Sequence, residues 1–160
     1  MKKFESKSSF SVKLLTIGII IVMGIVVFSI FTLNEKYGIL SGIVISVIIL
    51  GTLIYFFANS LKKIIIGEKN LMLEKNIGKI EIPFSDIIKI EKLDFSNLTM
   101  TFGSKGVFGY IGNTMDDSIA LVNDRKNMVR IITKEKKYTI SSDKREELIS
   151  EIKNVLQHRI

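Results

Sequence analysis

The chain has 160 residues, a formal net charge of +7 and no cysteine, and 47% of its residues are hydrophobic. This length allows one domain, or one small domain together with membrane spans. A sequence without cysteine excludes disulfides and thiolate metal sites. The positive charge is spread along the chain and lacks the clustered basic face that is typical of nucleic-acid-binding proteins, so we expect no nucleic-acid partner.

Two apolar stretches stand near the N-terminus, at residues 14–33 and 38–61, and neither contains a charged side chain. As a helix, each stretch is long enough to cross the hydrocarbon core of a bilayer, which is about 30 Å thick. The alternatives for the first stretch are a signal peptide and a buried core helix. The apolar segment of a signal peptide would be shorter and would end in small residues at a cleavage site. The sequence therefore predicts two transmembrane helices joined by the short turn 34–37.

Basic residues that flank the two spans predict their orientation. Residues 1–13 form a basic arm and more lysines follow the second span, whereas the turn 34–37 is neutral. Because lysine and arginine accumulate on the cytoplasmic side of spans, we expect both termini in the cytoplasm and the turn outside, in the plasma membrane. The flanking basic residues are Lys2, Lys3, Lys13, Lys62 and Lys63.

The two spans have the composition of an anchor. Neither contains Asp, Glu, Lys, Arg or His, the side chains that tend to mark ion or proton pathways inside a membrane. Gly38, Gly42 and Ser46 recur every fourth residue on the second span. Such a stripe of small residues permits close helix packing, but glycine is also common in membrane helices for other reasons, and both interpretations remain open.

From Lys62 to the C-terminus the hydrophobic pattern changes to that of β-strands. Apolar residues alternate with polar ones, as Ile80 and Ile82 do with Lys79 and Glu81, which predicts seven or eight short antiparallel strands. The final segment has a helical stripe made of Leu148, Ile149, Ile152, Val155 and Leu156. The domain 62–160 is therefore expected to be mainly β with one C-terminal amphipathic helix. Because no expected strand lies in residues 1–61, it should fold without them.

The segment TFGSKGVFGYIG, residues 101–112, has glycine at every third position. A P-loop would place Gly-Lys-Ser/Thr at the start of a helix, whereas here Lys105 precedes glycine and valine, so we do not expect nucleotide binding. Two interpretations remain: a turn-rich loop that folds its aromatic side chains into the core, or a surface on which a protein docks. The residues concerned are Phe102, Gly103, Gly106, Phe108, Gly109, Tyr110 and Gly112.

These patterns resemble a known family. A β-meander capped by one C-terminal helix resembles the pleckstrin-homology (PH)-like fold, and residues 102–112 are similar to the glycine–aromatic signature of a bacterial PH-like family. Residues 83–87, 123–129 and 137–141 and the final helix add to this resemblance. It implies an antiparallel β-barrel or sandwich on the cytoplasmic side, often preceded by two spans, that binds lipids or proteins.

The resemblance also limits the ligand and the chemistry. Phosphoinositide-binding PH domains carry a dense basic motif in their first hairpin, but residues 67–70 contain one lysine beside a glutamate. Asp116 and Asp117 are adjacent carboxylates suited to metal or acid–base chemistry, or simply to a turn before the next strand. No residues can be assembled into a catalytic or metal-binding set, so we expect neither an enzyme nor a cofactor.

The expected function follows from these features. We expect a membrane-anchored binding or adaptor module at the cytoplasmic face of a bacterial membrane, in contact with the bilayer and with a protein partner or a second copy of the chain. The alternatives are a domain that senses a lipid or small ligand, and an accessory subunit of a membrane transport or stress-response complex.

Overall fold

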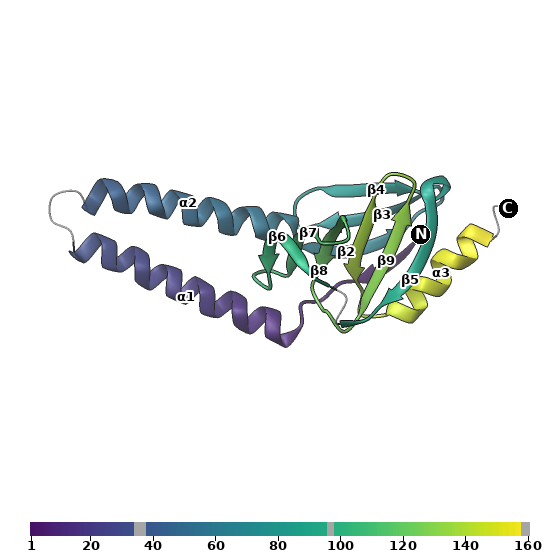
Figure 1. The fold of residues 1–160 in the computed structure, drawn as a ribbon, viewed down its shortest axis with the longest axis horizontal. Coiled ribbons are helices and arrows are strands. Elements are labelled where there is room, and N and C mark those ends of the chain that lie inside the picture. The colour runs from purple at the N-terminus through teal and green to yellow at the C-terminus, as the bar shows by residue number, and fades with distance from the viewer. Residues whose placement is uncertain (34–37, 96–97, 158–160) are drawn as a thin grey trace.

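The computed structural model describes residues 1–33, 38–95 and 98–157, so the expected turn 34–37 lies outside the described residues. Two long helices, α1 (Phe10–Leu33) and α2 (Gly38–Asn59), extend from one end of a β-sandwich. A shorter helix, α3 (Arg145–Gln157), packs near the other end (Figure 1). The predicted fold class is confirmed in its sandwich form, since the described strands make two sheets and no closed barrel.

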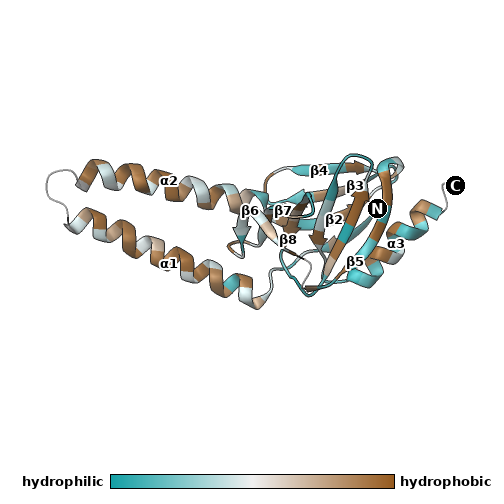
Figure 2. Cartoon of the chain, in the orientation of Figure 1, coloured by the Kyte–Doolittle hydropathy of each residue, from teal (hydrophilic) through white to brown (hydrophobic). Residues whose placement is uncertain are grey.

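Both N-terminal helices are long and apolar enough to cross a membrane, and only 6% of the apolar window of each is buried within the protein. Figure 2 shows hydrophobic residues along the length of both. The first helix begins at Phe10, earlier than the predicted 14, and the second ends at Asn59, because Leu61 already belongs to a strand. A Cβ on Gly42 would lie 2.9 Å from Cζ of Phe31, which supports the close-packing interpretation at this position.

The two sheets differ in size and in strand direction. The smaller is antiparallel, in the order β1-β2-β3-β4, with strands β1 (Lys2–Glu5), β2 (Leu61–Ile66), β3 (Asn70–Lys75) and β4 (Lys79–Pro83). After a short 3₁₀ turn (Phe84–Asp86) comes the larger, in the order β5-β9-β10-β8-β7-β6. Its strands are β5 (Ile87–Leu93), β6 (Met100–Lys105), β7 (Tyr110–Thr114), β8 (Ser118–Val122), β9 (Met128–Thr133) and β10 (Lys137–Ser141).

One strand pair is parallel, which the sequence did not predict. Strand β10 lies between β9 and β8 in the sheet. It is antiparallel to β9, with which it forms a hairpin, and parallel to β8. The alternation of apolar residues reports only which face of a strand is buried and contains no information on direction. The larger sheet is therefore mixed.

The basic arm 1–13 contributes a strand to the sandwich, contrary to the sequence interpretation. Strand β1 pairs with β2 and places Phe4 in the main core, where it is 2% exposed. Leu61, inside the predicted second span, is equally buried in this core. The expectation that no strand comes from residues 1–61 is therefore wrong: a strand of four residues with one large apolar side chain is too short to show a period.

Two β-bulges interrupt the alternation of buried and exposed side chains. The register shifts between Ile87 and Lys89, so Ile87 is buried while Ile88 is 65% exposed. It shifts again between Met100 and Phe102, which leaves Phe102 73% exposed. An extra residue in one strand moves the following side chains to the opposite face. The stripe on α3 is confirmed at Leu148, Ile149 and Ile152, which are buried in the main core.

Candidate functional site at the helix–sandwich junction

The glycine loop, residues 101–112, forms the β6–β7 hairpin, and its tip contacts both apolar helices. The backbone N–H of Phe108 donates a hydrogen bond to Oγ1 of Thr16 on α1, with an N···O distance of 2.9 Å. The Phe108 ring packs edge-on against Phe57 of α2, with ring centroids 5.6 Å apart. The loop therefore lies at the junction where the helices meet the sandwich.

Two of the glycines allow the strands of this hairpin to approach each other. Gly103 and Gly112 are register partners with φ angles of 115° and 142°. A Cβ on Gly103 would lie 2.1 Å from the carbonyl oxygen of Ile111, and one on Gly112 would lie 2.2 Å from that of Phe102. Any other residue would overlap the opposite backbone in a conformation that L side chains rarely adopt.

A third glycine allows the loop to approach a helix. A Cβ on Gly106 would lie 2.6 Å from Cδ2 of Leu15 on α1. The regular spacing of the glycines thus serves close packing within the hairpin and against α1. It does not form a phosphate-binding turn at the start of a helix, because the loop connects two strands.

The three aromatic residues of the loop have three different environments. Phe108 is half-buried against Phe57 and the main core. Tyr110 is half-buried against a second core cluster, with the Arg125 guanidinium carbon 5.1 Å from its ring centroid. Phe102 is 73% exposed on strand β6. One residue of the loop thus packs against the chain's own helix, and another is open to a partner.

Asn123 is a buried polar residue, 2% exposed, that joins the ends of both helices to the sandwich. Its Nδ2 donates to the carbonyl oxygens of Ser6 at 2.7 Å and of Leu61 at 2.5 Å. Its Oδ1 accepts a hydrogen bond from Oγ of Ser60 at 3.1 Å, and its carbonyl oxygen accepts one from the N–H of Ser9 at 3.0 Å. One side chain and its backbone thus join the segment before α1, the segment after α2 and strand β8.

No pattern in the sequence indicates the role of Asn123, which sequence reasoning therefore missed. Asparagine is common in turns, and nothing in its neighbours shows that its amide is buried. Ser60 adds a second link, because its one hydroxyl hydrogen is shared between Oδ1 of Asn123 and the closer carbonyl oxygen of Phe108, at 2.8 Å. Buried polar groups that lose such partners destabilise a fold by about 1–3 kcal/mol each, so these bonds stabilise the junction.

The five basic residues expected beside the membrane occupy different places. Lys2 forms ion pairs with Glu147 at 3.2 Å and Glu151 at 2.7 Å on α3, at the end of the sandwich away from the apolar helices. Hydrogen bonds to Glu151 and then Glu147 raise the pKa of the Lys2 ammonium. Lys3 is exposed on β1, and Lys63 pairs with Glu74 at 3.1 Å.

Lys13 and Lys62 are the members of this set that lie at the junction. Lys13 is in the first turns of α1, and Lys62 follows Leu61 at the start of β2. Both are exposed, and within the described ranges neither makes an ion pair. Their charges are therefore available to a partner outside the chain.

The aspartate pair supports the turn that precedes β8. Asp116 pairs with Arg130 and accepts a hydrogen bond from Oγ1 of Thr114 at 2.5 Å. Burial acts to raise the pKa of Asp116, but hydrogen bonds from Thr114 and Ser118 and the Arg130 charge together hold this pKa below its ordinary value. Asp117 occupies the left-handed region of the turn, with φ of 59°. Asp116 is thus engaged by its own neighbours.

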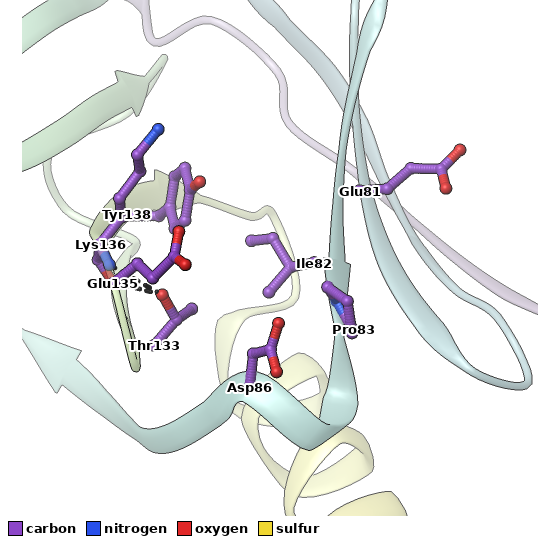
Figure 3. A pocket seen from close by; sticks show the side chains of 8 residues that line it. All are labelled: Glu81, Ile82, Pro83, Asp86, Thr133, Glu135, Lys136 and Tyr138. Atoms are coloured by element: carbon purple, nitrogen blue, oxygen red, sulfur yellow. Dashed lines mark hydrogen bonds between the residues drawn. The ribbon is translucent and has the colours of Figure 1, made fainter.

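A polar hollow of about 130 Å³ lies between β4 and the β9–β10 turn (Figure 3). Ile82, Asp86 and Glu135 face a common space there, whereas Glu81 points away from it. Burial, and then the charge of Glu135, raise the pKa of the nearby Tyr138 hydroxyl. Among the described residues no three acidic, histidine or cysteine side chains are placed to hold a metal ion. The hollow thus lies between a strand of the smaller sheet and a turn of the larger sheet.

Comparison with known families identifies the sandwich. The family model described as the bacterial PH domain matches residues 62–156, which include β2 to β10 and nearly all of α3. The chain belongs to the bacterial PH-domain family. No curated protein and no solved structure matches it. PH-like domains are generally binding modules without catalytic activity, and in this PH domain the junction with α1 and α2 adds contacts outside the matched segment.

Proposed function

We propose that this protein is an integral membrane protein that presents a PH-like binding module to a protein partner at the cytoplasmic face of the plasma membrane. The observation that supports the proposal most is the junction itself. Hydrogen bonds from Asn123, Ser60 and Phe108 join the PH domain to the ends of α1 and α2. A domain joined in this way has a fixed orientation relative to the bilayer.

The exposed apolar surface of the helices supports membrane insertion. Large side chains such as Phe28, at 68% exposed, and Ile39, at 68%, cover both helices. Each such side chain gains roughly 1.5–3 kcal/mol when it is removed from water. An apolar helix in the core of a soluble protein would be mostly buried. Here only 6% of the apolar segment of each helix is buried within the protein. A bilayer is the environment that covers this much apolar surface.

The free edge of the larger sheet supports a protein partner. Strand β6 is the last strand of that sheet and carries Phe102, which is 73% exposed, while Met115 after the next strand is 71% exposed. An edge strand has unpaired backbone groups that an extended segment of another protein can bind, and nearby apolar side chains give the contact specificity. We therefore assign the partner-binding surface to β6 and Phe102.

Cysteine labelling tests the membrane topology, because the chain has no cysteine of its own. In intact cells, a membrane-impermeant maleimide should label Asn34→Cys and should not label Asn154→Cys on the exposed side of α3. Permeabilisation should make the second position reactive. The physical basis is the lysine content of the two sides, with Lys13 and Lys62 beside the cytoplasmic ends of the helices. Labelling in the opposite order would contradict this orientation.

Photo-crosslinking tests the partner surface. A photoreactive phenylalanine at Phe102 should give a defined adduct in cells on illumination. Ile88 on β5, the other edge strand of the same sheet, is the matched control because it is 65% exposed. An adduct of two chains would identify a second copy of this 18.1 kDa protein as the partner, and another mass would identify a different protein. Equal adducts from both positions, or none from Phe102, would refute this assignment.

A further inference from the structure

A cleft of about 310 Å³ opens at the junction, between the ends of α1 and α2. Its walls come from the first turns of α1, the last turns of α2, the β3–β4 turn and the tip of the glycine loop. Figure 1 shows that the two helices are closer together at their ends away from the sandwich than at this junction. The cleft therefore lies at the wide end of the space between the helices.

The walls present mainly apolar surface to whatever occupies this cleft. Val12 and Ile17 line it from α1, and Phe57 and Phe108 line it opposite. Two hydroxyls in the walls, those of Thr16 and Ser60, are bonded within the protein. Oγ1 of Thr16 donates to the Val12 carbonyl oxygen at 2.7 Å. The Ser60 hydroxyl is bonded to the Phe108 carbonyl oxygen. The rest of the wall surface is mainly apolar and offers water few hydrogen-bond partners.

A positive charge stands beside this apolar surface. Lys13, which also lines the cleft, is exposed and has no ion pair among the residues that the structure describes. It lies one turn before Ile17 on α1. From Ile17 to Phe31, the exposed residues of α1 are all apolar. The cleft is therefore continuous with the surface that we assign to the bilayer, and its cation lies at the end of that surface next to the sandwich.

We infer that this cleft binds one anionic phospholipid, with an acyl chain against Ile17, Phe57 and Phe108 and the phosphate beside Lys13. The inference rests on the proposed membrane insertion of α1 and α2. An acyl chain fills the apolar space that the diverging helices leave, and the lipid phosphate complements a lysine that the protein does not neutralise. The site is formed by the helix–sandwich junction and is separate from the β2–β3 turn of the PH domain.

Native mass spectrometry of the full-length protein in mild detergent tests this inference, with dioleoylphosphatidylglycerol and dioleoylphosphatidylcholine as probes. The wild-type protein should bind one phosphatidylglycerol about fivefold more tightly than phosphatidylcholine, as one cation near an anionic lipid implies. Lys13→Gln should abolish that preference, and Lys13→Glu should reverse it. Lys62→Gln is the matched control, because it removes an exposed junction charge outside the cleft and should retain the preference.

A second pair of variants tests the acyl-chain site. Ile17→Trp should fill the cleft and remove the tightly bound lipid of either kind. Val22→Trp, at an equally exposed position on another side of α1, should retain it. Wild-type affinity in both Lys13→Gln and Ile17→Trp would overturn the inference, as would equal wild-type affinity for the two lipids. Alkaline extraction of membranes separates the two ways of failing. If the lipid site fails but the chain stays in the membrane, only the lipid site is refuted. If the chain is extracted, the proposed membrane insertion fails as well.

Discussion

Gly103→Ala should disrupt the glycine loop and lower the melting temperature of the detergent-solubilised protein by on the order of 10 °C. The new Cβ would lie 2.1 Å from the carbonyl oxygen of Ile111, in a backbone with φ of 115°. The strained backbone alone costs roughly 1–3 kcal/mol, and the overlap with a backbone atom adds to this. Because the loop tip contacts Thr16 and Phe57, the junction should loosen together with the hairpin.

Gly78→Ala is the matched control for this substitution. Gly78 also has a positive φ, of 84°, but a Cβ there would meet only Cε of Lys75, at 3.9 Å. The Gly78→Ala variant should therefore show the cost of the backbone conformation without any atomic overlap. Its melting temperature should be only a few degrees below that of the wild-type protein. If Gly103→Ala melts no lower than Gly78→Ala, close approach of the two strands is not what requires glycine at position 103.

Deleting residues 1–61 should leave a chain without a cooperative melting transition. The deletion removes strand β1 and two core side chains, Phe4 and Leu61, each of which is 2% exposed. Loss of one buried Phe or Leu side chain typically costs about 2–5 kcal/mol, and a small domain is stable by only about 5–15 kcal/mol. Circular dichroism of the truncated protein, followed during heating, measures this outcome.

A matched variant separates the role of β1 from that of the helices. Residues 1–9 joined to residues 60–160 by about six Gly and Ser residues should fold as a soluble sandwich. Ser9 and Ser60 both bond to Asn123, so the two ends are close enough for such a linker, which reaches roughly 20 Å. Cooperative melting of the simple deletion would show that β1 is dispensable. Failure of the linked variant would show that α1 and α2 are needed for folding.

The contacts at the junction assign different roles to the residues of the glycine loop. The loop was interpreted from sequence as either a core element or a docking surface. In the structure Phe108 packs between the chain's own helix and its sandwich, and Phe102 alone is largely exposed. One loop thus joins the PH domain to its helices and presents an aromatic side chain beside a free sheet edge.

Local patterns in the sequence determined the helices and strands in which buried side chains recur at a regular interval. Residues 14–33 and 38–61 contain no charged side chain, a pattern typical of helices that cross a membrane, so both helices were predicted. The structure has a helix in each stretch that is long and apolar enough to do so. The stripe on α3 and the alternation around Ile82 were predicted for the same reason: side chains recur on the buried face with the period of the element. The family resemblance was also carried by the order of these elements and is confirmed over residues 62–156.

Contacts between distant parts of the chain were decided only by the tertiary structure. Strand β1 became visible through its pairing with β2, some sixty residues away, and the faces of Ile88 and Phe102 depended on bulges set by the partner strands. The role of Asn123 depends on Ser6 and Leu61, which reach it only because α1 and α2 return the chain to the same end of the sandwich. A local pattern records whether a side chain is buried, but hydrogen-bond partners and strand register are properties of the assembled fold.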